Sequence, residues 1–270
     1  MTRKRLIVCN WKMNPQTESE ALDLFGATLA AAKAAPGATV IVAPPFPFLS
    51  AIENRFGLAQ AEANHHAQIY LAAQDVFWER DGSFTGEVSA VMEKNVGVTH
   101  VIIGHSERRR FLGETDDMVA KKLKKALESG LIPILCIGEE ERPAGEIPER
   151  VGEELQSAVV GLNPTLLETL VVAYEPVWAI GSGTPDTPEG MQKAALYIRK
   201  VLTECCGESA ADKIRILYGG SVTAANVAAF FEETGGQVAG VLVGGASLYA
   251  DEVDKIIKTV NLIPADMNAR

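Results

Sequence analysis

The sequence is dominated by a strand-like apolar run that recurs eight times along the chain. Most of these runs are apolar at successive positions and rich in β-branched residues, a pattern typical of strands buried on both faces of a parallel sheet. Their starts are about 33 residues apart, which leaves room for one helix between consecutive runs. The runs cover residues 6–12, 39–45, 69–74, 100–106, 132–138, 170–176, 214–220 and 240–246.

The segments between the runs carry helix signals. Residues 116–129, for example, begin with two acids, carry four lysines later and end before Gly130, an order that complements a helix dipole. Residues 18–33, 188–206, 224–233 and 248–260 are interpreted as helices too. Eight strand–helix units without a Ser/Gly/Pro-rich linker predict an α/β protein, a single (β/α)8 barrel domain over residues 1–270. The alternative is an open doubly wound sheet, which usually has fewer strands.

Charge and cysteine content exclude several classes of protein. The formal net charge of −10 repels a nucleic-acid backbone or an anionic membrane at long range, so we expect neither as a partner. The four cysteines form no CxxC pair, which argues against zinc and favours free thiols in a reducing compartment. The basic N-terminus precedes an apolar run too short for a signal peptide, and no stretch has the ~18 apolar residues of a spanning helix. We therefore expect a cytoplasmic protein.

A parallel barrel brings the carboxyl ends of its strands to one rim, where the following loops carry the chemistry. The polar residues that the predicted strands deliver there include Asn10, Lys12, His105, Glu107 and Glu175, besides Gln74, Asp75, Ser106 and Glu139. Glu175 interrupts an apolar run before Pro176, so a general base is favoured over the surface salt bridge usual for a lone glutamate. His105 is interpreted as a catalytic group or a satisfied polar side chain, and Lys12 as a local cation or a snorkelling surface lysine.

Two glycine pairs, Gly219-Gly220 and Gly244-Gly245, stand at the ends of the last two predicted strands, each before a predicted helix. Glycine lets the backbone approach a ligand closely and a helix N-terminus attracts anions, so the pairs predict a phosphate site rather than tight turns alone. The chain has no P-loop, no GxGxxG after a strand and no GxSxG motif. A small anionic substrate, held by the charge of Lys12, is the favoured ligand.

Two other clusters receive structural interpretations. His65 and His66 lie in an added stretch at 56–66 and are candidate metal ligands, but no Cys, Asp or third His stands nearby at ligand spacing, and a solvated loop or helix end is favoured. The arginines at 108–110 are flanked by Glu107 and Glu114, which predicts an ion-pair cluster rather than a nucleic-acid site.

Seven motifs together resemble the triosephosphate isomerase family. They are NWKMN at 10–14, TGE at 85–87, IGHSERR at 103–109, CIGE at 136–139, AYEPVWAIG at 173–181, YGGSV at 218–222 and LVGGASL at 242–248, in order over almost the whole chain. The resemblance implies a TIM barrel that needs no metal or organic cofactor. It also implies interconversion of dihydroxyacetone phosphate and D-glyceraldehyde 3-phosphate through an enediolate.

The resemblance assigns a role to each matching polar residue. Glu175 would move the proton between two carbons, a neutral His105 would polarise the carbonyl, and Lys12 would supply positive charge. Asn10 would orient the substrate and Glu107 would support Lys12. Backbone N–H groups of Gly181, Ser221, Gly244 and Gly245 would bind the phosphate under a lid at 176–184. The family is also dimeric, so we expect a homodimer in which the loop at 75–87 reaches into the partner.

The chain departs from the family pattern at the end of the lid, which reads Gly181-Ser182-Gly183-Thr184-Pro185. We expect this to affect lid movement rather than the reaction. Two other functions are weighed. A Schiff-base aldolase needs a lysine at the end of an inner strand, commonly the sixth, where this chain has Glu175. A non-catalytic barrel that binds phosphosugars or a protein is disfavoured by Lys12, His105 and Glu175 together.

Overall fold

The computed structural model, which describes residues 4–59, 69–142 and 146–263, is a closed barrel of parallel strands. Consecutive strands pair in sequence order and β8 returns to pair with β1, so the predicted barrel is confirmed and the open sheet is excluded. The strands are β1 (Arg5–Asn10), β2 (Ala38–Ala43), β3 (Ile69–Ala73), β4 (Val98–Ile103), β5 (Ile132–Glu139), β6 (Val171–Pro176), β7 (Arg215–Tyr218) and β8 (Gly240–Val243).

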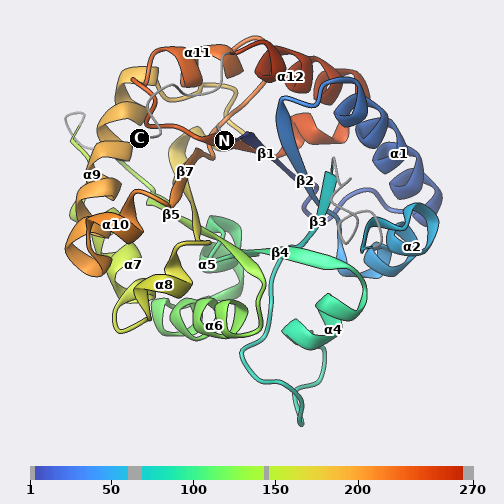
Figure 1. The fold of residues 1–270 in the computed structure, drawn as a ribbon, viewed down its shortest axis with the longest axis horizontal. Helices are drawn as coiled ribbons and strands as arrows, with labels where there is room; N and C mark the ends of the chain where they lie inside the picture. The colour runs from blue at the N-terminus through green and yellow to red at the C-terminus, as the bar shows by residue number, and fades with distance from the viewer. Residues whose placement is uncertain (1–3, 60–68, 143–145, 264–270) are drawn as a thin grey trace.

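Helices form a ring outside the strands (Figure 1). They are α1 (Glu18–Ala34), α2 (Phe46–Phe56), α4 (Ala90–Asn95), α5 (Ser106–Leu112), α6 (Asp116–Glu128), α7 (Glu149–Val159), α8 (Pro164–Leu167), α9 (Pro188–Cys206), α10 (Glu208–Ala211), α11 (Val227–Glu232) and α12 (Ala250–Leu262), with 3-10 turns η2 (Val177–Ala179) and η3 (Gly245–Leu248). Side-chain caps explain several starts: Thr17 and Glu20 form a capping box at α1, and the Thr115 hydroxyl accepts from the Met118 N–H at α6.

Two apolar layers account for the uninterrupted hydrophobic runs. Side chains on one face of the strands fill the barrel, among them Leu6, Val8 and Ile41. Side chains on the other face, such as Ile7 and Val40, pack beneath the helices. Each strand is therefore buried on both faces, which removes the alternation that a half-exposed strand would show.

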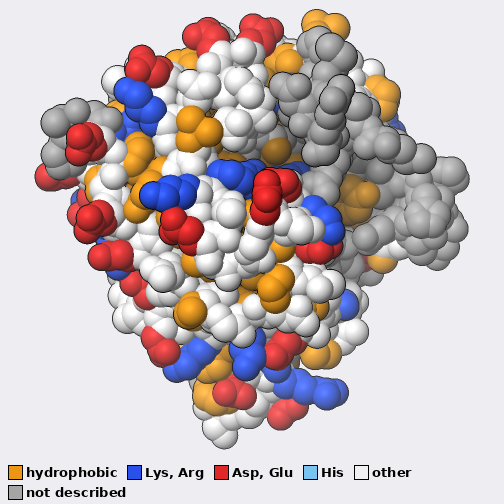
Figure 2. All heavy atoms as spheres, turned by 60° about the vertical axis from the view of Figure 1, so that its left-hand side comes forward, with side chains coloured by type: hydrophobic (Ala, Val, Ile, Leu, Met, Phe, Trp, Pro, Cys, Tyr) orange, Lys and Arg blue, Asp and Glu red, His pale blue; other side chains and the backbone are white. Residues whose placement is uncertain are grey.

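The outer surface of the helices carries side chains of both charges. On α9, Lys193 pairs with Glu189 and Lys200 with Glu204 at helical spacing. Figure 2 brings this side forward and shows acidic and basic side chains interspersed over it. Solvated pairs of this kind contribute little stability individually. Here they place hydrated charged groups on the outer face of α9.

Most predicted runs extend one to three residues beyond their strands, so Lys12 and Gly220 lie in rim loops and Ser106 begins α5. One predicted boundary differs from the structure. The helix predicted over 224–233 begins at Val227, after a turn held by Asn226, so that turn separates the glycine pair at β7 from α11. At β8 the glycine pair leads directly into η3, which begins at Gly245.

The added stretch at 56–66 is only partly described. Phe56 ends α2 and Gly57 follows in a left-handed conformation (φ 63°). His65 and His66 lie outside the described residues. Within the described parts of the chain, no group of His, Cys, Asp or Glu has the arrangement of a metal site, and no helix is long and apolar enough to cross a membrane.

Candidate active site

The rim of the barrel holds a cavity of about 280 Å³ at the carboxyl ends of the strands. Eight of the nine residues predicted for the site line it: Asn10, Lys12, His105, Glu175, Gly181, Ser221, Gly244 and Gly245. The ninth, Glu107, does not line the cavity but binds Lys12. The barrel thus brings together residues that stand as far apart in sequence as Asn10 and Gly245.

The backbone of Lys12 has an unusual conformation. Its φ of 54° is left-handed, a conformation that lysine adopts only when its surroundings impose it. Here the Asn10 side chain accepts from the Lys12 N–H at 3.0 Å, and the Gln74 amide donates to the Lys12 carbonyl at 2.8 Å. Lys12 Nζ lies 2.6 Å from Glu107 Oε1. The Lys12 ammonium group therefore lies at the cavity wall, where the Glu107 carboxylate balances part of its charge.

His105 presents one defined nitrogen to the cavity. It caps the N-terminus of α5, where its Nδ1 accepts from the Glu107 N–H at 3.2 Å. A nitrogen that accepts a hydrogen bond carries no proton, so a neutral His105 carries its proton on Nε2. That nitrogen lies 3.2 Å from Glu175 Oε1. His105 is thus arranged to donate from Nε2 into the cavity.

Glu175 is buried, with 1% of its surface exposed, at the end of β6. Its Oε2 accepts from the Ser106 N–H at 3.0 Å, next to the His105 contact on Oε1. Burial, reinforced by the nearby Glu175 carboxylate, raises the pKa of the Cys136 thiol well above its usual value. Cys136 therefore stays protonated beside Glu175 and cannot act as a nucleophile there. The sequence placed Cys136 in the CIGE motif but indicated no such contact.

The opposite wall of the cavity consists largely of backbone. A β-carbon added at Gly181 or Gly245 would meet nothing within 4 Å, and one at Gly244 would meet only the Lys12 side chain, at 3.4 Å. The turn that carries Ser221 is held by Asn226, whose amide donates to the Ser221 carbonyl at 3.0 Å. Open backbone beside one lysine suits an anionic group.

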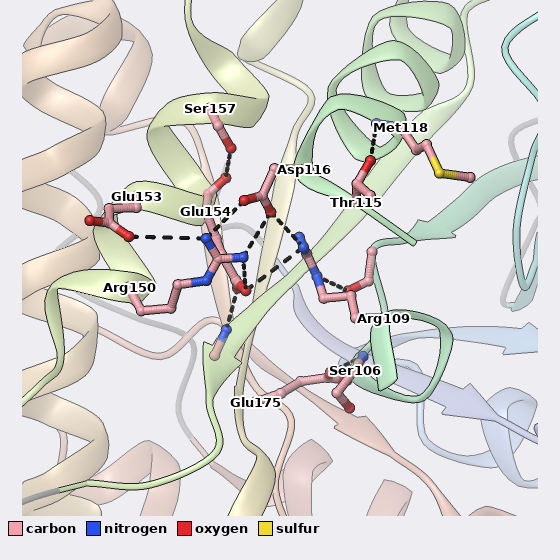
Figure 3. A network of polar contacts seen from close by, with 12 residues as sticks. Ser106, Arg109, Thr115, Asp116, Met118, Arg150, Glu153, Glu154, Ser157 and Glu175 are labelled. Carbon is pink, nitrogen blue, oxygen red and sulfur yellow. Dashed lines mark hydrogen bonds and ion pairs between the residues drawn. The ribbon is translucent and has the colours of Figure 1, made fainter. Parts of the chain in front are cut away.

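A partly exposed ion-pair network lies near Ser106 and Glu175 of the site (Figure 3). Arg109 pairs with Asp116 at 2.6 Å and donates to the Gly104 carbonyl at 3.0 Å, while Glu154 Oε2 accepts from the Gly138 N–H at 3.1 Å. Arg150 bridges Asp116 and Glu154. The predicted ion-pair cluster is confirmed for Arg109, and for Arg108, which binds Asp75 and Glu114. Glu154 and Arg150 were missed because they lie in a helix, away from any strand end.

A sequence model of the family "Triosephosphate isomerase" matches residues 5–260 of the chain. The chain belongs to the triosephosphate isomerase family. It is 42% identical over 258 residues to the triosephosphate isomerase of Geotalea uraniireducens, an alignment covering 95% of this chain and 98% of the relative. It is 43% identical over 258 residues to that of Citrifermentans bemidjiense (95% and 98%) and 42% identical over 260 residues to that of Acetivibrio thermocellus (96% and 99%).

Membership of the triosephosphate isomerase family decides between the functions weighed from the sequence. The reaction is the interconversion of dihydroxyacetone phosphate and D-glyceraldehyde 3-phosphate. The aldolase and the non-catalytic barrel are set aside. Family membership alone assigns no role to an individual side chain. Such a role depends on the geometry of the cavity.

Proposed function

We propose that the 280 Å³ rim cavity is where this isomerisation occurs, with Glu175 as the base, His105 as the proton donor to the carbonyl and Lys12 as the cation. One observation carries the proposal. Three different strand ends deliver a carboxylate, an imidazole N–H and an ammonium to one small cavity, with the carboxylate and imidazole only 3.2 Å apart. This is the set of groups that moving a proton beside a carbonyl requires.

The chemistry follows from these positions. Glu175 takes a proton from the carbon next to the carbonyl, and negative charge develops on the carbonyl oxygen. The His105 Nε2–H and Lys12 Nζ stabilise that charge in a site largely screened from water. His105 gives its Nε2 proton to that oxygen and takes a proton from the hydroxyl on the neighbouring carbon. The protonated Glu175 returns its proton to the former carbonyl carbon, which completes the exchange of aldehyde and ketone. Asn10 supports this arrangement by holding the Lys12 backbone.

The phosphate binds at the backbone wall formed by Gly181, Ser221, Gly244 and Gly245 in this proposal. Residues 176–184 then act as a lid, because Gly181 and Ser182 lie in an exposed stretch at the cavity mouth. Closure protects the enediolate, which in open solvent can expel its phosphate. No metal or organic cofactor takes part in these steps.

The assignment of the base is tested by replacing Glu175 with glutamine in a coupled assay that starts from D-glyceraldehyde 3-phosphate. Glu175→Gln keeps the shape of the side chain but removes its basicity, so kcat is expected to fall by about 10²–10⁴-fold. Glu140→Gln is the matched control, since Glu140 is an exposed carboxylate on the same side that does not line the cavity. Full activity in Glu175→Gln would show that another group is the base.

We further propose that the enzyme is a homodimer. Several large apolar side chains are exposed on the segments that follow β1, β3 and β4: Met13, Phe84, Val91, Met92, Phe111 and Leu112. The chain between β3 and α4 projects from the barrel (Figure 1), as expected for a loop that reaches into a partner. Phe111→Asp is expected to give a monomer by sedimentation velocity, whereas Leu196→Asp, on the outer face of α9, leaves the dimer intact. A dimer in Phe111→Asp at micromolar concentration would argue against this surface.

A cytoplasmic location is also proposed. All four cysteines are free thiols, which suits a reducing compartment. Fractionation of cells with an antibody against the chain tests this, and a signal confined to a membrane or secreted fraction would overturn it.

A further inference from the structure

Glu139, at the end of β5, is the centre of a buried cluster beside the start of the proposed lid. Its Oε1 accepts from the Tyr174 hydroxyl at 2.7 Å, from the Trp178 indole N–H at 3.1 Å and from Arg142 Nε at 3.1 Å. Tyr174 lies in β6 and Trp178 in η2. The carboxylate therefore joins the barrel wall to the first turn of the lid.

Arg142 extends this cluster to the other end of the lid. Its two terminal nitrogens bind Asp186 in a bidentate pair, Nη1 to Oδ1 at 2.9 Å and Nη2 to Oδ2 at 2.7 Å. Nη2 also donates to the Tyr174 hydroxyl, and the guanidinium lies 5.1 Å from the centre of the Trp178 ring. The Arg142 side chain is 9% exposed and that of Asp186 4%, so the pair is largely withdrawn from water. One cation thus contacts residues on both sides of the segment 179–185.

The segment between these ends is held only weakly. Residues 181–184 are exposed, and Gly181 and Gly183 adopt φ of 66° and 75° with open space on the side where a β-carbon would point. The hydrogen bonds of Ser182 run within the segment, to the carbonyls of Ala179 and Thr184. The segment is therefore free to move between two anchored ends.

The two anchors differ in strength. The Trp178 end is held by one indole hydrogen bond to Glu139 and by the contact of its ring with the Arg142 guanidinium. The Asp186 end is joined by a bidentate, charge-assisted pair, and its backbone N–H also donates to the Tyr218 hydroxyl at 2.9 Å. Bidentate pairs of this kind are stronger and more directional than a neutral hydrogen bond. The Trp178 end is the one that can release.

We infer that Arg142 is a positioning residue for the lid: with Asp186 it clamps the far end of the segment 179–185 to β5 and β6, so that closure over the phosphate pivots on that end. This inference rests on the proposed lid role of residues 176–184. Arg142 touches no reacting atom. It acts by limiting the conformations that the lid samples when open, so that less ordering is needed when the phosphate binds.

The test compares a substrate that carries the phosphate with one that does not. Arg142→Met, which keeps the aliphatic stem, and Asp186→Asn are expected to raise KM for D-glyceraldehyde 3-phosphate about tenfold, the lower end for loss of a charge-assisted bond. Exchange of the carbon-bound proton of D-glyceraldehyde, which lacks the phosphate, is expected to proceed at the unmodified enzyme's rate. Lys213→Met, which removes a 2.8 Å pair with Glu168 away from the lid, is the matched control and leaves both substrates unchanged.

A second measurement reports on closure itself. When the enediolate is not enclosed, its electron pair expels the phosphate by breaking the carbon–oxygen ester bond, which releases inorganic phosphate and leaves the enol of methylglyoxal. The ratio of inorganic phosphate released to product formed is expected to increase several-fold in Arg142→Met and Asp186→Asn. The double variant should resemble Arg142→Met, because the interaction that Asp186→Asn removes is already lost in that variant.

Three results would overturn the inference. An unchanged KM and phosphate-release ratio in a folded Asp186→Asn would show that the pair does not position the lid. Equal losses with both substrates would show a general structural role, and thermal unfolding identifies that case. Additive effects in the double variant would show that the two residues act separately. Failure of the proposed catalytic roles is distinguishable, since it would appear as full activity in Glu175→Gln.

Discussion

Gly138 packs directly against the backbone of Glu175 where β5 pairs with β6. The two residues are partners in the strand register, and a β-carbon at 138 would lie 1.8 Å from the Glu175 carbonyl oxygen. No side chain fits at that separation without moving a strand. The position of the proposed base is therefore set in part by a glycine on the neighbouring strand, whose N–H is held by Glu154.

Gly138→Ala is accordingly expected to displace Glu175 and reduce kcat about 10²-fold, the loss typical of a displacement of about 1 Å. Steady-state kinetics on folded protein provides the measurement. Gly26→Ala is the control, because a β-carbon at Gly26 in α1 would make only ordinary contact with Phe56, at 3.6 Å. That variant should keep full activity and gain about 0.5–1 kcal/mol of stability. Wild-type kcat in Gly138→Ala would refute the close-contact argument.

Lys12→Met should weaken transition-state stabilisation, since Lys12 is the only lysine or arginine that lines the cavity among the described residues. We expect kcat/KM to fall about 10²–10³-fold, as for removal of one donor to a developing negative charge. Binding of inorganic phosphate, measured by calorimetry, should weaken as well. Glu107→Gln removes the partner of Lys12 without removing the cation and should have a smaller effect. Tight phosphate binding by Lys12→Met would place the anion elsewhere.

Glu93 predicts a pH dependence of stability. It is 1% exposed, neither carboxylate oxygen has a hydrogen-bond partner within the described structure, and burial, with Asp75 nearby, raises its pKa to about 9. Between about pH 4.5 and 9 the folded protein keeps this proton while the unfolded chain has lost it. The residue therefore lowers stability progressively as pH rises through that window.

Glu93→Gln removes this ionisation. It is expected to increase the free energy of unfolding by up to about 3 kcal/mol at pH 7, with the gain shrinking towards pH 4.5. Urea unfolding at several pH values measures the difference between the two proteins. Glu128→Gln, an exposed glutamate at the end of α6, should show no such trend. A gain independent of pH would mean that Glu93 is not protonated in the folded state.

Thiol reactivity should divide the cysteines into two classes. Cys9 and Cys136 are buried inside the fold, and burial raises the pKa of Cys9 to about 12. Cys205 and Cys206, at the end of α9, are partly exposed. An aromatic disulfide reagent at pH 8 is expected to modify Cys205 and Cys206 in the native protein and all four thiols after denaturation. Fast native modification of Cys9 would contradict the described packing.

The barrel and most of the cavity were predictable because both depend on patterns within short segments of the sequence. A strand buried on both faces must be apolar at successive positions, so β1 and β6 can be recognised from the sequence. Asn10, His105 and Glu175 are then identified as polar residues at the ends of such apolar runs. Their place on one rim then follows from the parallel topology. Expectations about the single domain over residues 1–270, the dimer and the role of each site residue stay predictions.

Other features carry no local signal. Arg142 and Asp186 stand 44 residues apart, and neither belongs to a motif. Glu154 looks like any solvated helix residue, yet it holds the Gly138 N–H. The start of α11 was predicted three residues too early, at 224 instead of Val227, because a turn held by Asn226 resembles a helix start in sequence.

The sequence by itself determined the eight strands, their burial and the residues that reach the rim. Burial and backbone pairing restrict which residue types each short segment can contain, so each strand can be recognised from its own residues. Only the tertiary structure decided that Nε2 of His105 faces Glu175, that Lys12 lies against Glu107, and that Arg142 joins both ends of the lid. These are contacts between side chains brought together by closure of the barrel. Their distances depend on how distant segments pack, and no local pattern encodes that packing.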